Sequence, residues 1–249
     1  MGNASAINAG PWSPECLTGR SNAHIVESAE PGYRLQPPAA AALAAMRAAA
    51  AADGIDLHPL SSFRDFAHQC RIWNEKYRGQ RPLLDAQGRA VDALSLPEPE
   101  RVAAILLWSA LPGASRHHWG TDLDVIDRAC LAPGARPQLT RAEYGPRGCF
   151  AGLDAWLERR AAEFGYFRPY DRDRGGVQPE PWHLSFAPLA APALEALTVE
   201  VLAAALREAE LDGRAEVLRQ LPQLHARYVR AVAPPPQRAL DFNPAARSS

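Results

Sequence analysis

The chain has 249 residues, and its 27 basic and 28 acidic side chains give a formal net charge of −1. This balance gives no general attraction to nucleic acid or to anionic lipid, so we expect neither as a partner. The length is enough for one large domain or two small ones with a hydrophobic core that needs no disulfide or metal.

Patterning along the chain predicts helices and short strands in mixed order. Residues 1–35 are rich in Gly, Pro, Ser and Asn and predict an irregular lead-in. Apolar residues at helical spacing then predict helices, and alternating segments predict strands. In chain order we expect a helix at 38–52, a strand at 55–60, a helix at 63–77, a polar excursion at 79–99, a helix at 99–111, a strand at 121–126, a loop-rich insertion at 128–148, a helix at 153–164, strands at 166–170 and 183–186, and two helices within 192–232 that break near Asp212.

This order has no βαβ rhythm and favours an α+β fold. It divides the chain into the lead-in at 1–35, a main domain at 36–190, C-terminal helices at 191–232 packed on that domain, and a tail at 233–249. Three consecutive prolines predict that the tail lies on the surface or is disordered.

No segment predicts a membrane span, because the best candidate, residues 102–111, is too short and is typical of a buried helix. The first twenty residues lack a basic start followed by an apolar stretch, which argues against a signal peptide. We therefore expect a cytoplasmic location, or a periplasmic or envelope location if the N-terminus is processed or the chain is exported otherwise. The cysteines show no CxxC spacing and are expected to be free and buried, with a Cys130–Cys149 bridge as the alternative in an oxidising compartment.

Three short segments concentrate residues that can carry chemistry: 61–64 (SSFR), 115–124 (SRHHWGTDLD) and 180–183 (EPWH). His117, Asp124 and His183 together supply two imidazoles and one carboxylate, which suits a catalytic zinc that keeps a fourth position open. A carboxylate that does not bind the metal, such as Glu180, can take a proton from a water molecule there.

Each segment also has an ordinary interpretation. The two neighbouring histidines can belong to a turn, with one ring packed and one exposed. Asp122 and Asp124 share one face of the predicted strand, and such a face is usually a solvated edge. Residues 180–183 can form a loop with a packed tryptophan, and Arg64 can be an ion-paired surface residue.

Together, the segments resemble the zinc signature of the D-alanyl-D-alanine carboxypeptidases and dipeptidases of vancomycin resistance. These VanY-like enzymes belong to the lysostaphin, D-Ala-D-Ala peptidase and hedgehog group. The matching pattern is Ser115-x-His117-x-x-Gly120-x-x-x-Asp124, followed by Glu180-x-Trp182-His183. Residues 61–64, with Gln69 five residues on, are similar to the family's upstream Ser-Gly-Tyr-Arg segment. The resemblance covers roughly residues 35–190 and implies a small, mostly antiparallel sheet that carries the zinc site.

The resemblance also implies roles for individual residues. His117, Asp124 and His183 would bind one Zn²⁺, and Glu180 would act as general base and then as general acid. Arg64 would bind the substrate and stabilise the oxyanion, because its planar fork suits carbonyl and carboxylate oxygens. Further implied substrate contacts are Ser115 and Gln69.

The chain departs from the family pattern at three positions. Asp122 stands where a small residue is usual, and the sequence leaves open whether its carboxylate approaches the ion. Ser62 replaces the usual glycine. His118 adds an imidazole beside the expected ligand, so an exchange of His117 and His118 stays open, although the family spacing favours His117.

The implied activity is that of a zinc-dependent carboxypeptidase that removes a C-terminal D-alanine from peptidoglycan-type peptides. L,D-carboxypeptidase, D,D-dipeptidase and peptidoglycan endopeptidase activities remain open for the same residues. Two non-enzymatic alternatives also remain: a zinc-containing peptidoglycan-binding module, against which the presence of Glu180 argues, and an α+β domain without metal. The sequence predicts no oligomeric state.

Overall fold

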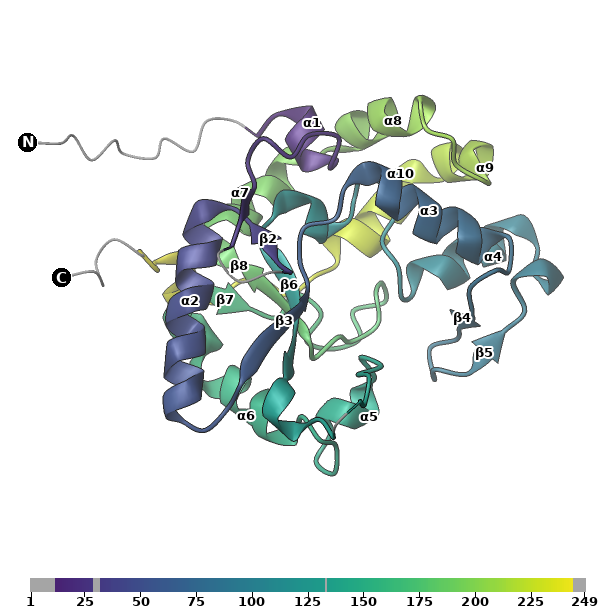
Figure 1. The fold of residues 1–249 in the computed structure, drawn as a ribbon. Helices are drawn as coiled ribbons and strands as arrows, with labels where there is room; N and C mark the ends of the chain where they lie inside the picture. Colours follow the sequence, from purple (N-terminus) through teal and green to yellow (C-terminus); the bar gives the residue numbers. More distant parts are fainter. Residues whose placement is uncertain (1–11, 29–31, 133, 244–249) are drawn as a thin grey trace, which may run out of the picture.

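A computed structural model describes residues 12–28, 32–132 and 134–243. Its centre is a four-stranded antiparallel sheet in the order β3-β6-β8-β7 (Figure 1). The strands span Leu57–Ser61 (β3), Asp122–Asp127 (β6), His183–Phe186 (β8) and Tyr166–Phe167 (β7). Helices surround the sheet, so the predicted α+β class is confirmed.

One face of the sheet packs against α2 (Pro37–Ala52) and α6 (Ala151–Arg160), which lie beside it in Figure 1. Alternation along β6 places Leu123 and Val125 on this face, where both are fully buried. Leu43 and Met46 of α2 belong to the same core. Asp122 and Asp124 share the opposite face, as predicted, but both are buried, so this face is not a solvated edge.

A second core joins the N-terminal and C-terminal parts of the chain. It includes the buried Trp73 and Trp119, and the Trp119 Nε1–H donates to the Leu17 carbonyl at 3.1 Å. The helices that contribute to it are α1 (Pro14–Leu17), α3 (Phe66–Tyr77), α4 (Glu98–Leu106), α7 (Ala187–Ala196), α8 (Val199–Arg207), α9 (Arg214–Arg219) and α10 (Leu221–Leu224).

Short elements occur where the sequence predicts loops. The 79–99 excursion contains a hairpin of β4 (Leu83–Leu84) and β5 (Ala90–Val91), and the 128–148 insertion contains α5 (Arg141–Tyr144), which begins with a capping box. The lead-in contains α1 and a second two-stranded ladder of β1 (Val26–Glu27) and β2 (Arg34–Leu35). The remaining short turns are η1 (Ala93–Ser95), η2 (Arg116–Trp119), η3 (Arg128–Cys130), η4 (Ala161–Phe164) and the π-helical η5 (His225–Arg230).

The C-terminal region is divided more finely than the two predicted helices. The helix α7 begins at Ala187, directly after β8. The next helix, α8, starts afresh because the Thr198 side chain caps it by accepting from the Val201 N–H. Gly213, at φ +70°, then separates α8 from α9 near the predicted break.

Part of the predicted tail is a packed helix. Residues 244–249 lie outside the described residues, but α11 spans Gln237–Leu240 and its Ala239 is fully buried. Phe242 follows and packs edge-on against Phe186 of β8, with ring centroids 6.0 Å apart. The sequence does not predict this helix, because the prolines before it dominate the local pattern.

All four cysteines are free, as expected, but none of them is buried as predicted. Cys16 and Cys70 are half-buried, whereas Cys130 and Cys149 are exposed. Within the described residues, no single helix is long and apolar enough to cross a membrane. The pair α7 and α8 passes that test only together, and it is bent by 75°.

We predict that Phe242→Ala lowers the free energy of unfolding by about 1–2 kcal/mol, because the ring loses its buried contact with the sheet. Leu240→Ala is the matched control, since that side chain is 36% exposed and its loss should change stability little. Urea denaturation measures both. Equal effects of the two variants would show that the contact of Phe242 with Phe186 adds no stability of its own.

Candidate functional site

The pairing of β6 with β8 brings two of the predicted metal ligands together. Asp124 pairs with His183, and the adjacent pair is Leu123 with Leu184. Side chains alternate along a strand, so the leucines enter the core while Asp124 and His183 point to the opposite face. This face forms the floor of the site.

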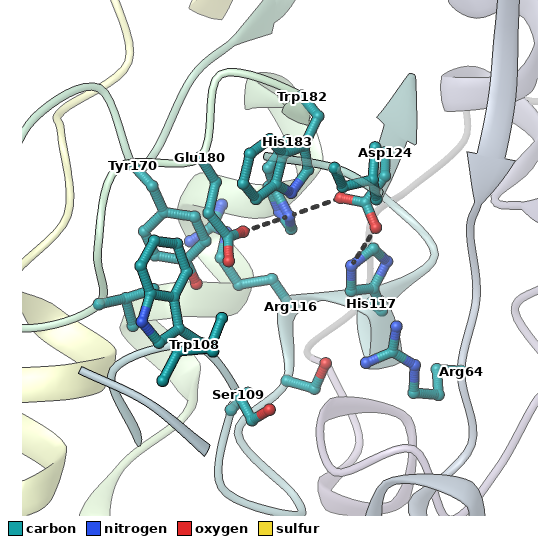
Figure 2. A pocket seen from close by; sticks show the side chains of 15 residues that line it. Arg64, Trp108, Ser109, Arg116, His117, Asp124, Tyr170, Glu180, Trp182 and His183 are labelled. Atoms are coloured by element: carbon teal, nitrogen blue, oxygen red, sulfur yellow. Dashed lines mark ion pairs between the residues drawn. The ribbon is translucent and has the colours of Figure 1, made fainter. Parts of the chain in front are cut away.

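His117 reaches the same place from η2, the turn that precedes β6. Gly120 ends this turn at φ +64°, a conformation that favours glycine, and a Cβ there would lie 2.1 Å from Ile25 Cδ1. The chain can therefore turn directly from His117 into the strand that carries Asp124. Potential ligand atoms of His117, Asp124 and His183 all lie within 4.8 Å of one another, and all three residues are buried (Figure 2).

Hydrogen bonds fix which nitrogen of each histidine faces Asp124. His117 Nδ1 lies 2.9 Å from the Ser62 carbonyl oxygen, to which it donates, so Nε2 faces Asp124 at 3.5 Å. His183 Nε2 lies 2.9 Å from Asp122 Oδ1, so Nδ1 faces Asp124 at 3.2 Å. These two nitrogens, once unprotonated, are available to one metal ion.

The electrostatics of the cluster favour a cation between these groups. Burial lowers the pKa of His117 to about 3. Burial also disfavours charge on His183, but its contacts with the Asp122 and Asp124 carboxylates outweigh this and raise its pKa to about 9. Asp124 Oδ1 is buried, and among the described residues the approach of His183 Nδ1 at 3.2 Å is not supplemented by any hydrogen bond. A divalent cation at this point would satisfy that oxygen.

Glu180 stands beside the cluster on the loop before β8. Its Oε2 lies 3.5 Å from His183 Nδ1, and its backbone N–H donates to the Tyr170 carbonyl at 3.0 Å. Burial raises the pKa of Glu180 to about 7, although the nearby His183 opposes the shift. A carboxylate with such a pKa can both accept and donate a proton near neutral pH.

The structure answers the two questions that the sequence leaves open. Each oxygen of Asp122 accepts two hydrogen bonds from protein groups, so this carboxylate does not reach toward the ion. His118 is also occupied: its Nδ1 donates to the Arg64 carbonyl at 2.6 Å and its Nε2 accepts from the Gly113 N–H at 3.2 Å. His117, not His118, belongs to the metal cluster.

Arg64 lies across the cavity from Glu180 (Figure 2). Its Nη1 donates to Gln69 Oε1 at 2.9 Å and its Nη2 to Ser61 Oγ at 3.4 Å. Gln69 is fully buried and donates to the Ala110 carbonyl at 2.7 Å, so it stands behind Arg64 and does not line the cavity. Ser115 does line it.

The site opens into a cavity of about 290 Å³. Its floor is the metal cluster with Glu180, and one wall carries Arg64, Ser115 and Ser109. The remaining wall is mostly apolar, and it is lined by Leu84, Trp108, Leu139, Tyr170, Val177 and Trp182.

Ser109 and Lys76 form a pair that sequence reasoning missed. The Lys76 ammonium donates to Ser109 Oγ at 2.6 Å, and burial lowers the pKa of Lys76 to about 8. Because an ammonium only donates, Ser109 must accept, and its own O–H can donate into the cavity. A signal existed in the sequence, since Lys76 is the only lysine in a chain with 27 basic residues.

Comparison with known proteins decides the family. The sequence model described as VanY, D-alanyl-D-alanine carboxypeptidase, matches residues 32–189. The chain belongs to the VanY family. The resemblance drawn from the motifs is thus confirmed, and the family is one of peptidases that act on peptidoglycan peptides.

The chain is also similar to two uncharacterised proteins of Haemophilus influenzae. One is 42% identical over 102 residues, which is 40% of this chain and 70% of the relative. The other is 32% identical over 121 residues, which is 48% of this chain and 92% of the relative. Neither has a described activity to compare with the site.

Solved structures of similar shape include three peptidases. VanYB in complex with D-Ala-D-Ala is 21% identical, with a TM-score of 0.48 and coverage of 69% of this chain and 81% of that chain. A mutant of the D,D-pentapeptidase VanY with Zn(II) is 23% identical, with a TM-score of 0.47 and coverage of 72% and 88%. The LD-carboxypeptidase LdcB is 22% identical, with a TM-score of 0.47 and coverage of 69% and 67%. At these scores, family membership rests on the matched sequence model.

We predict that His117→Ala abolishes stoichiometric zinc binding, whereas His118→Asn retains it. His118→Asn should instead lower the thermal stability, because the Arg64 carbonyl and the Gly113 N–H lose buried partners. Elemental analysis after dialysis against zinc and thermal denaturation give the two readouts. Loss of zinc from the His118 variant alone would reverse the ligand assignment.

Proposed function

We propose that this chain is a zinc-dependent carboxypeptidase that removes a C-terminal D-alanine from peptidoglycan-type peptides. The observation that carries the proposal is the buried cluster of His117, Asp124 and His183 with Glu180 beside it, at the floor of a cavity. A purely structural or binding site has no need for a carboxylate with a pKa raised to about 7 next to the ligands.

The donor set fits Zn²⁺. Two imidazole nitrogens and one carboxylate are the three protein ligands of many catalytic zinc sites, and the buried Asp124 Oδ1 lacks another partner among the described residues. When bound, the ion supplies positive charge that acidifies a water molecule and polarises the scissile carbonyl.

Glu180 supplies proton transfer. Its carboxylate takes the proton of the attacking water at Oε2, and the same group then gives that proton to the departing amine. Its place 3.5 Å from the ligand nitrogen of His183 puts it within reach of the reacting atoms. The raised pKa suits both halves of this exchange at neutral pH.

The opposite wall supports binding of a chain end. Among the described residues Arg64 forms no ion pair with a carboxylate, so its guanidinium is available to the C-terminal carboxylate or the oxyanion of the substrate. The hydroxyls of Ser115 and Ser109 line the same wall. This concentration of donors favours a substrate with a free carboxylate.

The segment around α5 is tied to the apolar side of the cavity, and we take this as support for binding of a chain end over an extended strand. Arg141 of α5 donates to the Ala86 carbonyl at 3.0 Å, and its guanidinium lies 5.5 Å from the centre of the Trp108 ring. Trp108 and Leu139 both line the apolar wall of the cavity, so this contact ties α5 to that wall. An endopeptidase needs a groove that is open at both ends.

A panel of muropeptides tests the activity. Peptides ending in D-Ala-D-Ala, peptides ending in a single D-Ala and cross-linked dimers are incubated with zinc-loaded protein and analysed by mass spectrometry. We expect loss of one alanine from the D-Ala-D-Ala peptides. Cleavage of the single D-Ala or of the cross-link alone would assign L,D-carboxypeptidase or endopeptidase activity, and no cleavage would refute the proposal. Recycled wall peptides or precursors would be the substrate if the protein is cytoplasmic, as we propose.

Glu180→Gln should reduce kcat by about 10²–10⁴-fold, because the amide cannot take the proton of water. Zinc content should stay stoichiometric, since Glu180 is not a ligand. Activity is measured on the D-Ala-D-Ala peptide and metal by elemental analysis. Unchanged hydrolysis would remove Glu180 as the base.

Arg64→Lys keeps the positive charge but should lose about 10²-fold or more in kcat/KM, because one ammonium cannot replace two fixed N–H donors. The matched control is Arg81→Lys, an exposed arginine outside the cavity wall, which should keep wild-type activity. Near-wild-type rates for the Arg64 variant would limit Arg64 to a structural role.

A further inference from the structure

A buried ion pair lies next to the metal cluster, and its arginine also lines the cavity (Figure 2). Arg116 Nε donates to Asp122 Oδ1 at 2.7 Å, and the two side chains are 4% and 0% exposed. Burial of two charges costs desolvation free energy that an ion pair alone often fails to offset. Neither residue has a part in the proton transfer or substrate binding described above, so the pair needs another explanation.

The carboxylate of Asp122 is held by four donors. Oδ1 accepts from Arg116 Nε at 2.7 Å and from His183 Nε2 at 2.9 Å. Oδ2 accepts from Thr121 Oγ1 at 2.5 Å and from Ser185 Oγ at 3.1 Å. With all its lone pairs used, Asp122 has one orientation only.

Arg116 is held as firmly as its partner. Its Nη2 donates to Ser185 Oγ at 2.6 Å, and its guanidinium carbon lies 4.7 Å from the centre of the buried Trp119 ring. Ser185 thus links Arg116 to Asp122 a second time, since it accepts from one and donates to the other. This network meets the metal cluster through the Nε2–H of His183, and it leaves Arg116 Nη1 buried without a hydrogen-bond partner among the described residues.

We propose that Arg116 and Asp122 are positioning residues for the metal ligand His183. Asp122 accepts the Nε2–H and so directs Nδ1 toward Asp124 and the ion, while Arg116 holds Asp122 and balances its charge. The inference rests on the proposed zinc site, because it gives a role to one of its ligands. Carboxylates that bind the second nitrogen of a histidine ligand fix the orientation and tautomer of the ring.

The strand register explains why this arrangement needs both residues. Asp122 pairs with Ser185 and Asp124 pairs with His183, so the carboxylate and the ligand lie on adjacent rungs of the same sheet face. Asp124 is only two residues away, and a second unbalanced carboxylate there would compete for the cation. Arg116 removes that competition because it occupies the oxygen nearest to His183.

Three variants separate positioning from stability. Asp122→Ala removes the acceptor and leaves the charge of Arg116 buried without a carboxylate. The double variant Arg116→Met/Asp122→Ala removes both charges. The control is Asp127→Ala, because Asp127 is a buried aspartate at the other end of β6 that accepts from the backbone N–H groups of Asp56 and Ala129 and has no contact with a ligand.

Zinc affinity, measured by competition with a chromophoric chelator, should fall about 10–100-fold in both Asp122→Ala and the double variant. Thermal stability in chelator should fall in Asp122→Ala and recover in the double variant, since no buried charge remains unpaired. Asp127→Ala should lose stability but keep its zinc affinity. Asp122→Asn, which keeps an acceptor oxygen, should retain more affinity than Asp122→Ala.

Each result bears on a different part of the proposal. Wild-type zinc affinity in the double variant would overturn it, whether or not Asp122→Ala folds. An equal loss of affinity in Asp127→Ala would also overturn it, because general destabilisation would then explain the effect. Failure of the wild-type chain to bind zinc would instead refute the proposed function itself.

Discussion

The antiparallel register between β6 and β8 is the constraint on which the whole site depends. It pairs Asp124 with His183 on one face and Leu123 with Leu184 on the other. A slip of β8 by one residue against β6 would send His183 into the core and Leu184 toward the cavity, away from Asp124. The free energy of burying the leucines therefore also fixes the geometry of the metal cluster, and packing and chemistry are encoded by alternate residues of the same strands.

The paired strands β6 and β8 bring several negative charges close together, and other groups in the fold must balance these charges. The carboxylates of Asp122, Asp124 and Glu180 are all near His183, and burial raises the free energy of each as an anion. Arg116 balances Asp122, and a divalent cation between the histidines would balance Asp124. Glu180 shares His183 with the other two carboxylates, at 3.5 Å, and burial outweighs this contact and raises the pKa of Glu180 to about 7. Burial of Glu180 lowers the stability of the fold, but it also gives this side chain a pKa near neutrality, which acid–base catalysis requires.

The cavity walls come from segments with little regular structure. The β4–β5 hairpin with the end of α4, the α5 insertion and the loop before β8 each contribute side chains to it. They are anchored from outside by contacts such as the one between Arg141 and the Ala86 carbonyl. Residues outside the cavity also shape the site, because Gln69 holds Arg64 in place and Lys76 orients Ser109. Neither Gln69 nor Lys76 lines the cavity.

The sequence by itself determined the α+β class, the acidic and apolar faces of β6, and the family, because these follow from periodicity and from the spacing of a few residues. It did not determine the partners of Asp122, the choice between His117 and His118, the Lys76–Ser109 pair or the helix α11. Each of these depends on a contact with another segment of the chain. Asp122 meets Ser185, and His118 meets Gly113 and Arg64. Lys76 of α3 meets Ser109 after α4, and Phe242 meets Phe186. Local patterns carry no information on such contacts, since only the packed tertiary structure decides which polar groups meet once water is excluded.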